Sequence, residues 1–181
     1  SGECSHLYLA IDGVLAAVIA ITDPIREEAP QVVSMLRKCG LSKIVMMTGD
    51  SERTAKVVAA KVGVDEYYSE VLPEDKALYV EKEHQAGRKV IMIGDGVNDS
   101  PALSAADVGI AICDGAEMAR EIADITIAGD NLEELVTLKR LSNALVKRIH
   151  GNYRQIVGFN TGLILCGIGG VMQPATSALL H

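Results

Sequence analysis

Between residues 43 and 127 the sequence alternates short apolar runs with segments that favour helices, and this alternation limits the fold more than any other feature. Strands are predicted at residues 43–47, 67–71, 90–93, 108–112 and 125–127, and helices at residues 25–39, 51–62, 74–86 and 117–123. In three of these helices the residue immediately after the end is glycine, as it is at many helix ends. Such alternation predicts an α/β fold with a parallel, Rossmann-type sheet flanked by helices, because parallel strands need helical crossovers.

Residues 6–22 form two apolar runs on either side of Asp12-Gly13. A two-residue Asp-Gly connection between such runs predicts a β-hairpin, because both turn residues must accept positive φ. A second interpretation stays open, in which Asp12 is the nucleophile of a soluble phosphatase. Val14 stands where such an enzyme would usually carry a second acid, so the turn is the favoured interpretation.

Charge divides the chain into parts that face different surroundings. Residues 1–135 carry 12 Lys and Arg against 24 Asp and Glu, whereas residues 136–181 carry five basic residues and no acid. An acidic body with only six aromatic residues is not expected to bind nucleic acid. We therefore expect one folded domain at residues 1–135, followed by a basic juxtamembrane helix at residues 136–154.

The last segment, residues 155–181, is predicted to be a transmembrane segment and the start of a second. Residues 156–172 lack any charge, and the basic residues before them are typical of the cytoplasmic flank of a membrane span. This predicts a cell-membrane location, with lipid as a partner and residues 1–150 in the cytoplasm.

The stretch GDGVNDSPAL follows the predicted strand at residues 90–93 and leads into a helix-prone segment. Asp95, Asn98 and Asp99 therefore lie at the carboxyl end of a strand, where open α/β sheets bind ligands. Carboxylate and carboxamide oxygens suit Mg²⁺, which usually takes one or two carboxylates and keeps several waters. When such a motif stands alone, a helix-capping turn is the favoured interpretation.

Two other segments are expected at the same edge of the sheet. Thr48-Gly49-Asp50 offers a hydroxyl and backbone N–H groups before a helix, which suits a phosphate, and Lys76 offers a cation near the start of the next helix. Together with the carboxylates, these groups make up the electrostatic equipment of phosphoryl transfer.

The segments DPIR, MTGD, LPEDK and GDGVNDSPAL, in that order, closely resemble the phosphorylation domain of P-type ATPases, which has the haloacid-dehalogenase-like fold. The hairpin and the segments ADVGIAI, GAEMAREIADITI and NLEELV resemble the heavy-metal-transporting branch. The resemblance implies ATP and Mg²⁺ as cofactors. The matching residues are Thr48, Gly49, Asp50 and Lys76 for the phosphate, Asp95, Asn98 and Asp99 for Mg²⁺, and Asp23 and Arg26 for the hinge and the nucleotide.

Ile25 replaces the second proline of the family's hinge segment, but the departure that matters is an absence. The family's phosphorylated aspartate lies in an upstream Asp-Lys-Thr-Gly-Thr motif, which these 181 residues do not contain. We therefore expect a carboxyl-terminal fragment of an ATP-driven cation pump, inactive without its upstream part. The alternatives are the Asp12 phosphatase and a non-enzymatic truncated product.

The resemblance also implies a transported heavy-metal ion, monovalent or divalent. Asn160 and Cys166 are the candidate ligands within the predicted span, and a thiolate would favour copper or zinc. A lone cysteine in such a segment is more often a small apolar residue.

Overall fold

The computed structural model describes residues 4–22, 24–95, 98–112, 122–128 and 131–169. The chain divides into two compact units, residues 1–137 and 138–181. The described elements, in order, are β1 (Cys4–Ile11), β2 (Val14–Thr22), α1 (Ala29–Lys38), β3 (Val45–Met47), α2 (Glu52–Val62), β4 (Glu66–Tyr68), α3 (Pro73–Gln85), β5 (Ile91–Gly94), α4 (Ser100–Ala105), β6 (Val108–Ile112), β7 (Ile125–Ile127) and α6 (Glu133–Ile168).

The predicted hairpin is confirmed. β1 and β2 pair antiparallel, and the turn between them places Asp12 at a φ of 49° and Gly13 at a φ of 79°. Because strand side chains alternate between faces, the hairpin presents apolar groups on both. The exposed large apolar side chains are those of Leu7, Tyr8, Leu9, Ile11, Val14, Leu15, Val18 and Ile19.

The predicted parallel strands are present, but their backbone hydrogen bonds form two groups instead of one continuous sheet. β3 pairs with β4 in one group, and β5, β6 and β7 pair in that order in the other. Among the described residues, β3 and β5 therefore each have one edge without a strand partner. Periodicity in a sequence predicts strands and not which strands pair, so this division was not expected.

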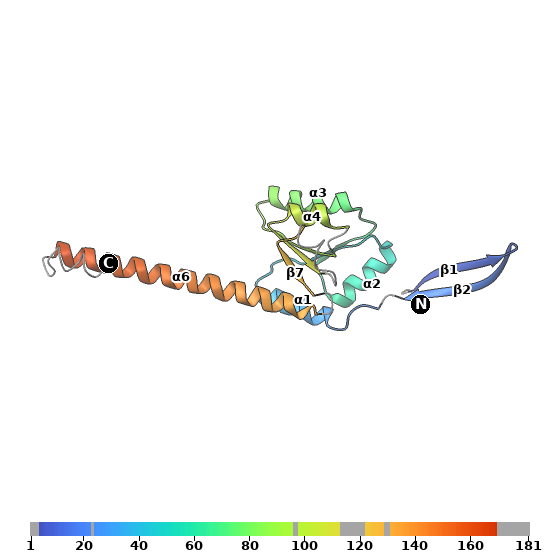
Figure 1. The fold of residues 1–181 in the computed structure, drawn as a ribbon, viewed down its shortest axis with the longest axis horizontal. Coiled ribbons are helices and arrows are strands. Elements are labelled where there is room, and N and C mark those ends of the chain that lie inside the picture. Colours follow the sequence, from blue (N-terminus) through green and yellow to red (C-terminus); the bar gives the residue numbers. More distant parts are fainter. Residues whose placement is uncertain (1–3, 23, 96–97, 113–121, 129–130, 170–181) are drawn as a thin grey trace. The chain divides into compact units, whose positions relative to one another are not determined.

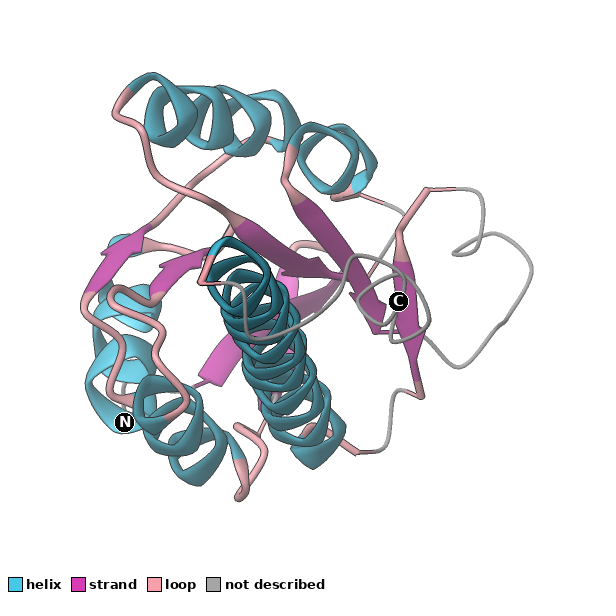
Figure 2. Ribbon diagram, turned by 90° about the vertical axis from the view of Figure 1, so that its left-hand side faces the viewer, coloured by secondary structure: helices cyan, strands magenta, loops and turns pink. Residues whose placement is uncertain are grey.

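Helices cover the strands on both faces, as predicted. Figures 1 and 2 show α3 and α4 on one face and α1 and α2 on the other. A core cluster under α3 and α4 consists of Val80, Met92, Ala102 and Leu103, and Met47 of β3 packs against it. The two groups of strands therefore share one core.

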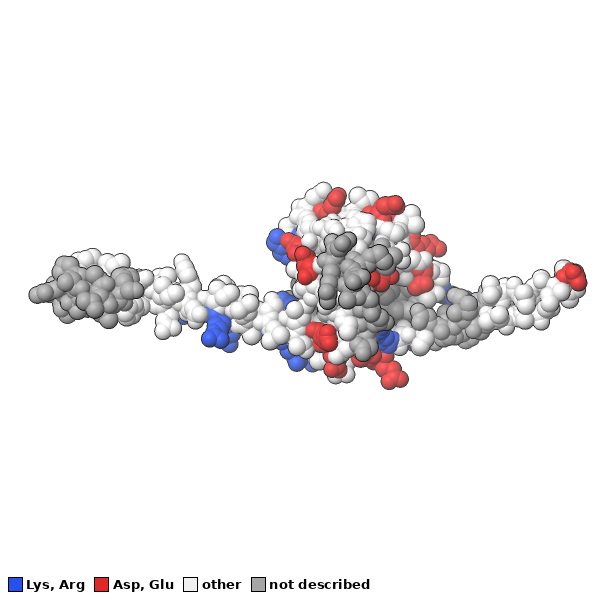
Figure 3. All heavy atoms as spheres, in the orientation of Figure 1, with Lys and Arg blue, Asp and Glu red and all other residues white. Residues whose placement is uncertain are grey.

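A long helix, α6, begins in the first unit and makes up the described part of the second. α6 continues through Gly151. A single glycine costs a helix only about 1 kcal/mol, which its neighbours offset. In Figure 3, acidic and basic side chains both lie on the α/β part, and basic side chains also lie along α6.

None of the helices within the described residues is both long enough and apolar enough to span a membrane. The domain boundaries at residues 135 and 155 stay predictions, and residues 170–181 lie outside the described part of the chain. Most of the helix predicted at residues 117–123 lies outside it as well.

Candidate active site

The Thr48-Gly49-Asp50 loop follows β3, at the carboxyl edge of its strand group. The Thr48 hydroxyl donates a hydrogen bond of 2.7 Å to Asp50 Oδ2 and accepts one of 3.1 Å from the Asp50 backbone N–H. The Thr48 N–H donates to the Tyr68 carbonyl at 3.0 Å. These contacts fix the direction of the loop just before α2 begins at Glu52.

Two residues that the sequence motifs did not indicate support this loop from the other side. The Glu52 carboxylate accepts hydrogen bonds from the Ser69 hydroxyl at 2.6 Å and from the Tyr67 hydroxyl at 2.8 Å. These donors, that of Ser69 first, lower the pKa of Glu52. Glu70 has a φ of 54°, and its N–H donates to the Asp50 carbonyl at 2.9 Å. For Glu52, the only signal in the sequence is its position two residues after the Thr48-Gly49-Asp50 motif, and this signal is weak.

Lys76 and Asp99 form the most buried ion pair among the described residues. The Lys76 ammonium lies 2.6 Å from Asp99 Oδ1, and the two side chains are 14% and 11% exposed. Lys76 comes from the first turns of α3 and Asp99 from the residue before α4. Burial of both groups means that each depends on the other for charge compensation.

Asp95 and Asn98 lie in the loop between β5 and α4. Asp95 is exposed, and its Oδ1 accepts a hydrogen bond of 3.3 Å from the Asn98 backbone N–H. Gly94, the last residue of β5, lies directly under the Asp99 side chain, because a Cβ built on it would come within 2.6 Å of the Asp99 Cβ. Position 94 therefore requires glycine, because a side chain there would collide with Asp99.

A short path of hydrogen bonds joins the Thr48 loop to Lys76. The Thr48 carbonyl accepts from the Val71 N–H at 3.0 Å, and the Leu72 carbonyl accepts from the Lys76 N–H at 3.3 Å. The loop and the ion pair are therefore connected through the beginning of α3.

The oxygen donors at this edge fit Mg²⁺ in number and type. Asp95 and Asp99 supply two carboxylates, and Mg²⁺ usually takes only one or two and completes its shell with water and phosphate. Within the described residues there is no group of three or more His, Cys, Asp or Glu side chains that would form a protein-only metal site.

The remaining predicted site residues lie elsewhere. Arg26 is exposed and lies 3.8 Å from Glu28, while Asp23 lies outside the described residues. Asn160 and Cys166 are six positions apart on α6, so their side chains leave the helix in directions about 120° apart. No described contact brings these four residues together.

A protein-family model described as haloacid dehalogenase-like hydrolase matches residues 5–107. The zinc-exporting P-type ATPase of Mycobacterium marinum is 43% identical over 176 residues, which cover 97% of this chain and 24% of that protein. The copper-transporting ATPase 2 of Rhizobium meliloti is 44% identical over 97% of this chain and 21% of its own length.

A crystal structure of a zinc-transporting PIB-type ATPase in the E2.Pi state matches with a TM-score of 0.84 and 31% identity. The match covers 99% of this chain and 29% of that one, so the chain spans about a quarter of the length of its relatives. The chain belongs to the haloacid dehalogenase-like hydrolase family, and the proteins that it resembles over nearly its whole length are heavy-metal P-type ATPases.

Proposed function

We propose that this chain supplies the phosphate-handling and Mg²⁺-handling half of an aspartyl-phosphate site in an ATP-driven heavy-metal cation pump. The observation that carries the proposal is the buried Lys76–Asp99 pair, which is tied through the start of α3 to the Thr48 loop. Hydrogen-bond donors for phosphate, a cation and carboxylates then lie toward the carboxyl ends of parallel strands, where ligands of such folds bind.

Each group has a separate task in this proposal. The Thr48 hydroxyl and the N–H groups of the loop hold phosphoryl oxygens, and Lys76 neutralises their charge. Asp95 and Asp99 hold Mg²⁺, which when bound neutralises charge on the phosphate and orients it. Asp50 keeps the loop in position through its two hydrogen bonds with Thr48. Asn98 supports Asp95 from the backbone.

The nucleophilic aspartate comes from a polypeptide segment outside these 181 residues. β3 and β5 each leave one edge without a strand partner among the described residues, and Met47 at the end of β3 packs against the core cluster that contains Met92 of β5. A further parallel strand between them would complete the sheet. It would bring a residue at its carboxyl end to the position between Thr48 and Asp95.

In this proposal the whole protein is a membrane pump that is driven by ATP hydrolysis, and the names of the relatives support this. One curated relative is named for zinc and another for copper, at nearly equal identity, so this segment does not discriminate between the ions. We place Arg26 and Asp23 near the nucleotide, and α6 with the residues after it at the membrane. Cys166 and Asn160 are the candidates for contact with the ion.

The proposal is tested by phosphorylation with radiolabelled ATP and Mg²⁺. The chain alone should yield no acid-stable phosphoenzyme and no ATP hydrolysis. Adding a segment with the Asp-Lys-Thr-Gly-Thr motif, or restoring it in one polypeptide, should yield a phosphoenzyme that Asp95→Ala abolishes.

Three results would count against the proposal. Turnover by the chain alone would contradict the half-site, and phosphatase activity that Asp12→Asn removes would replace it with the hairpin aspartate. Full phosphorylation of the Asp95→Ala variant would refute the metal assignment.

A further inference from the structure

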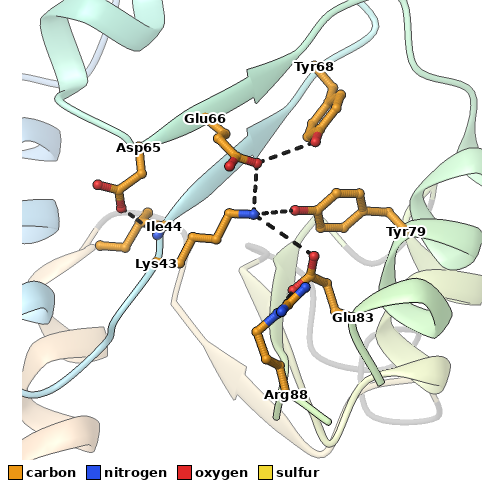
Figure 4. Close-up of polar contacts among 8 residues, drawn as sticks. All are labelled: Lys43, Ile44, Asp65, Glu66, Tyr68, Tyr79, Glu83 and Arg88. Carbon is orange, nitrogen blue, oxygen red and sulfur yellow. Dashed lines mark hydrogen bonds and ion pairs between the residues drawn. The ribbon is translucent and has the colours of Figure 1, made fainter. Parts of the chain in front are cut away.

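A cluster of polar side chains lies at the edge of the strands opposite the candidate active site. Lys43 precedes β3, Glu66 is the first residue of β4, and Arg88 stands three residues before β5. Tyr79 and Glu83 reach the same point from α3, and Figure 4 shows the five side chains converging. We call these five residues the Lys43 cluster.

Lys43 is the centre of the cluster. Its ammonium lies 2.8 Å from Glu66 Oε2, donates a hydrogen bond of 3.2 Å to the Tyr79 hydroxyl and lies 3.9 Å from Glu83 Oε1. The hydrogen bonds with Glu66 and then with Tyr79 raise the pKa of Lys43 above its ordinary value. One charge thus contacts β4 and two successive turns of α3.

Glu83 continues the cluster toward β5. This residue is only 7% exposed, and its carboxylate forms an ion pair with the Arg88 guanidinium. The backbone N–H of Arg88 also donates a hydrogen bond of 3.0 Å to the backbone carbonyl of Glu83. A buried carboxylate requires such partners, so Glu83 holds both Lys43 and Arg88 in place.

The location of these contacts matters because the strands are divided. Thr48, Gly49 and Asp50 follow β3, whereas Asp95 follows β5, and no ladder hydrogen bonds join these two strands within the described residues. Nearer the other edge, Met47 packs against the core cluster that contains Met92 of β5, and the Thr48–Val71 hydrogen bond joins the end of β3 to the chain just before α3. The Lys43 cluster is a charged link at the amino edge.

We propose that the Lys43 cluster is a positioning device that fixes the β3–β4 group against α3 and β5, and so keeps the two halves of the candidate active site in register. Lys43 and Glu66 act through the strands and touch neither phosphate nor metal. The role of the Lys43 cluster in catalysis rests on the proposed function, whereas the contacts within the cluster do not depend on that function.

Residual dipolar couplings of backbone amides in the full chain test the proposal directly. In the wild type, amides of residues 29–68 and amides of the described residues 91–95, 98–112 and 122–127 should fit one alignment tensor. Lys43→Met and Glu66→Gln should each lose this common fit, so that the two sets require separate tensors. Because the Glu66 side chain is 45% exposed, its substitution should preserve folding.

Two further variants separate positioning from general stability. Lys43→Arg keeps a cation within reach of both carboxylates and should restore the common fit. Lys89→Met is the matched control, because Lys89 is 89% exposed and pairs at 2.7 Å with Asp107, which follows α4 in the β5–β6–β7 part. The Lys89→Met variant should keep one alignment tensor for both sets of amides, even if urea unfolding shows that it loses as much stability as the cluster variants.

The outcomes are distinct from those of the proposed function. A common tensor retained in both Lys43→Met and Glu66→Gln, or the lack of one in the wild type, overturns the device. Titration of the wild type with Mg²⁺ and inorganic phosphate reports separately on the site. If the amides of Thr48 and Gly49 do not shift, the proposed function fails while the tensor result stands.

Discussion

Gly94 and Asp99 lie so close together that the last residue of β5 has no room for a side chain. A Cβ on Gly94 would stand 2.6 Å from the Asp99 Cβ. Gly94→Ala should therefore displace Asp99 from Lys76 and destabilise the chain by roughly 1–3 kcal/mol, as other overpacked sites do. Urea unfolding measures the loss. Gly151→Ala, with no atom within 4 Å of its new Cβ, is the control and should stabilise α6 by roughly 0.5–1 kcal/mol.

Lys76→Met should leave the Asp99 carboxylate buried without its cation. We expect a loss of about 3 kcal/mol in the free energy of unfolding at neutral pH, the scale of a broken buried pair. Lys89→Met, which breaks an ion pair of a lysine with an 89% exposed side chain, should cost less than about 1 kcal/mol. Equal losses in the two variants would show that the Lys76–Asp99 pair is not buried in solution.

Glu52 should hold the Thr48 loop through its shape and not through its charge. Glu52→Ala removes both hydroxyl contacts and should accelerate hydrogen exchange of the Glu70 and Val71 amides, which bond to the loop. Glu52→Gln should preserve slow exchange, because a carboxamide accepts from one hydroxyl and donates to the other. Fast exchange in both variants would indicate that the charge is required.

Asp107 should make the stability of the chain depend on pH in the acid range. Lys89, the Val90 N–H and His84 hold the pKa of Asp107 well below its ordinary value of 3.8. Because the folded-state pKa is depressed, the stabilisation is complete above about pH 3.8 and is lost as the pH falls below it. Asp107→Asn should be less stable than the wild type at pH 7, with a difference that shrinks between pH 4 and about pH 2. A constant difference would contradict the linkage.

The elements that local chemistry specifies were predicted well from the sequence. The Asp12-Gly13 turn was predicted because its backbone needs positive φ at both residues, and both have it. The strands at residues 108–112 and 125–127 agree with β6 and β7 to the residue. The strand predicted at residues 67–71 is shorter, because the chain from Ser69 to Val71 bonds to Glu52 and to the Thr48 loop instead of to a neighbouring strand.

Contacts between distant residues set the limit of prediction for the site. The motifs indicated Lys76 and Asp99 separately, but they are 23 positions apart, and only the fold of α3 onto α4 brings them into an ion pair. Glu52, Glu70 and the Lys43 cluster belong to no motif. Their roles follow from which strands and helices lie next to each other, and local sequence preference carries no information about that.

Because its strands form two groups, this chain suits the design of a split enzyme. Among the described residues, β3 and β5 each present one strand edge without a partner, and an unpaired edge is a template for an incoming strand. Placing the reactive aspartate on that strand would make catalysis an on–off readout of association between two polypeptides. A biosensor built on this chain would report binding through the formation of a covalent phosphoenzyme.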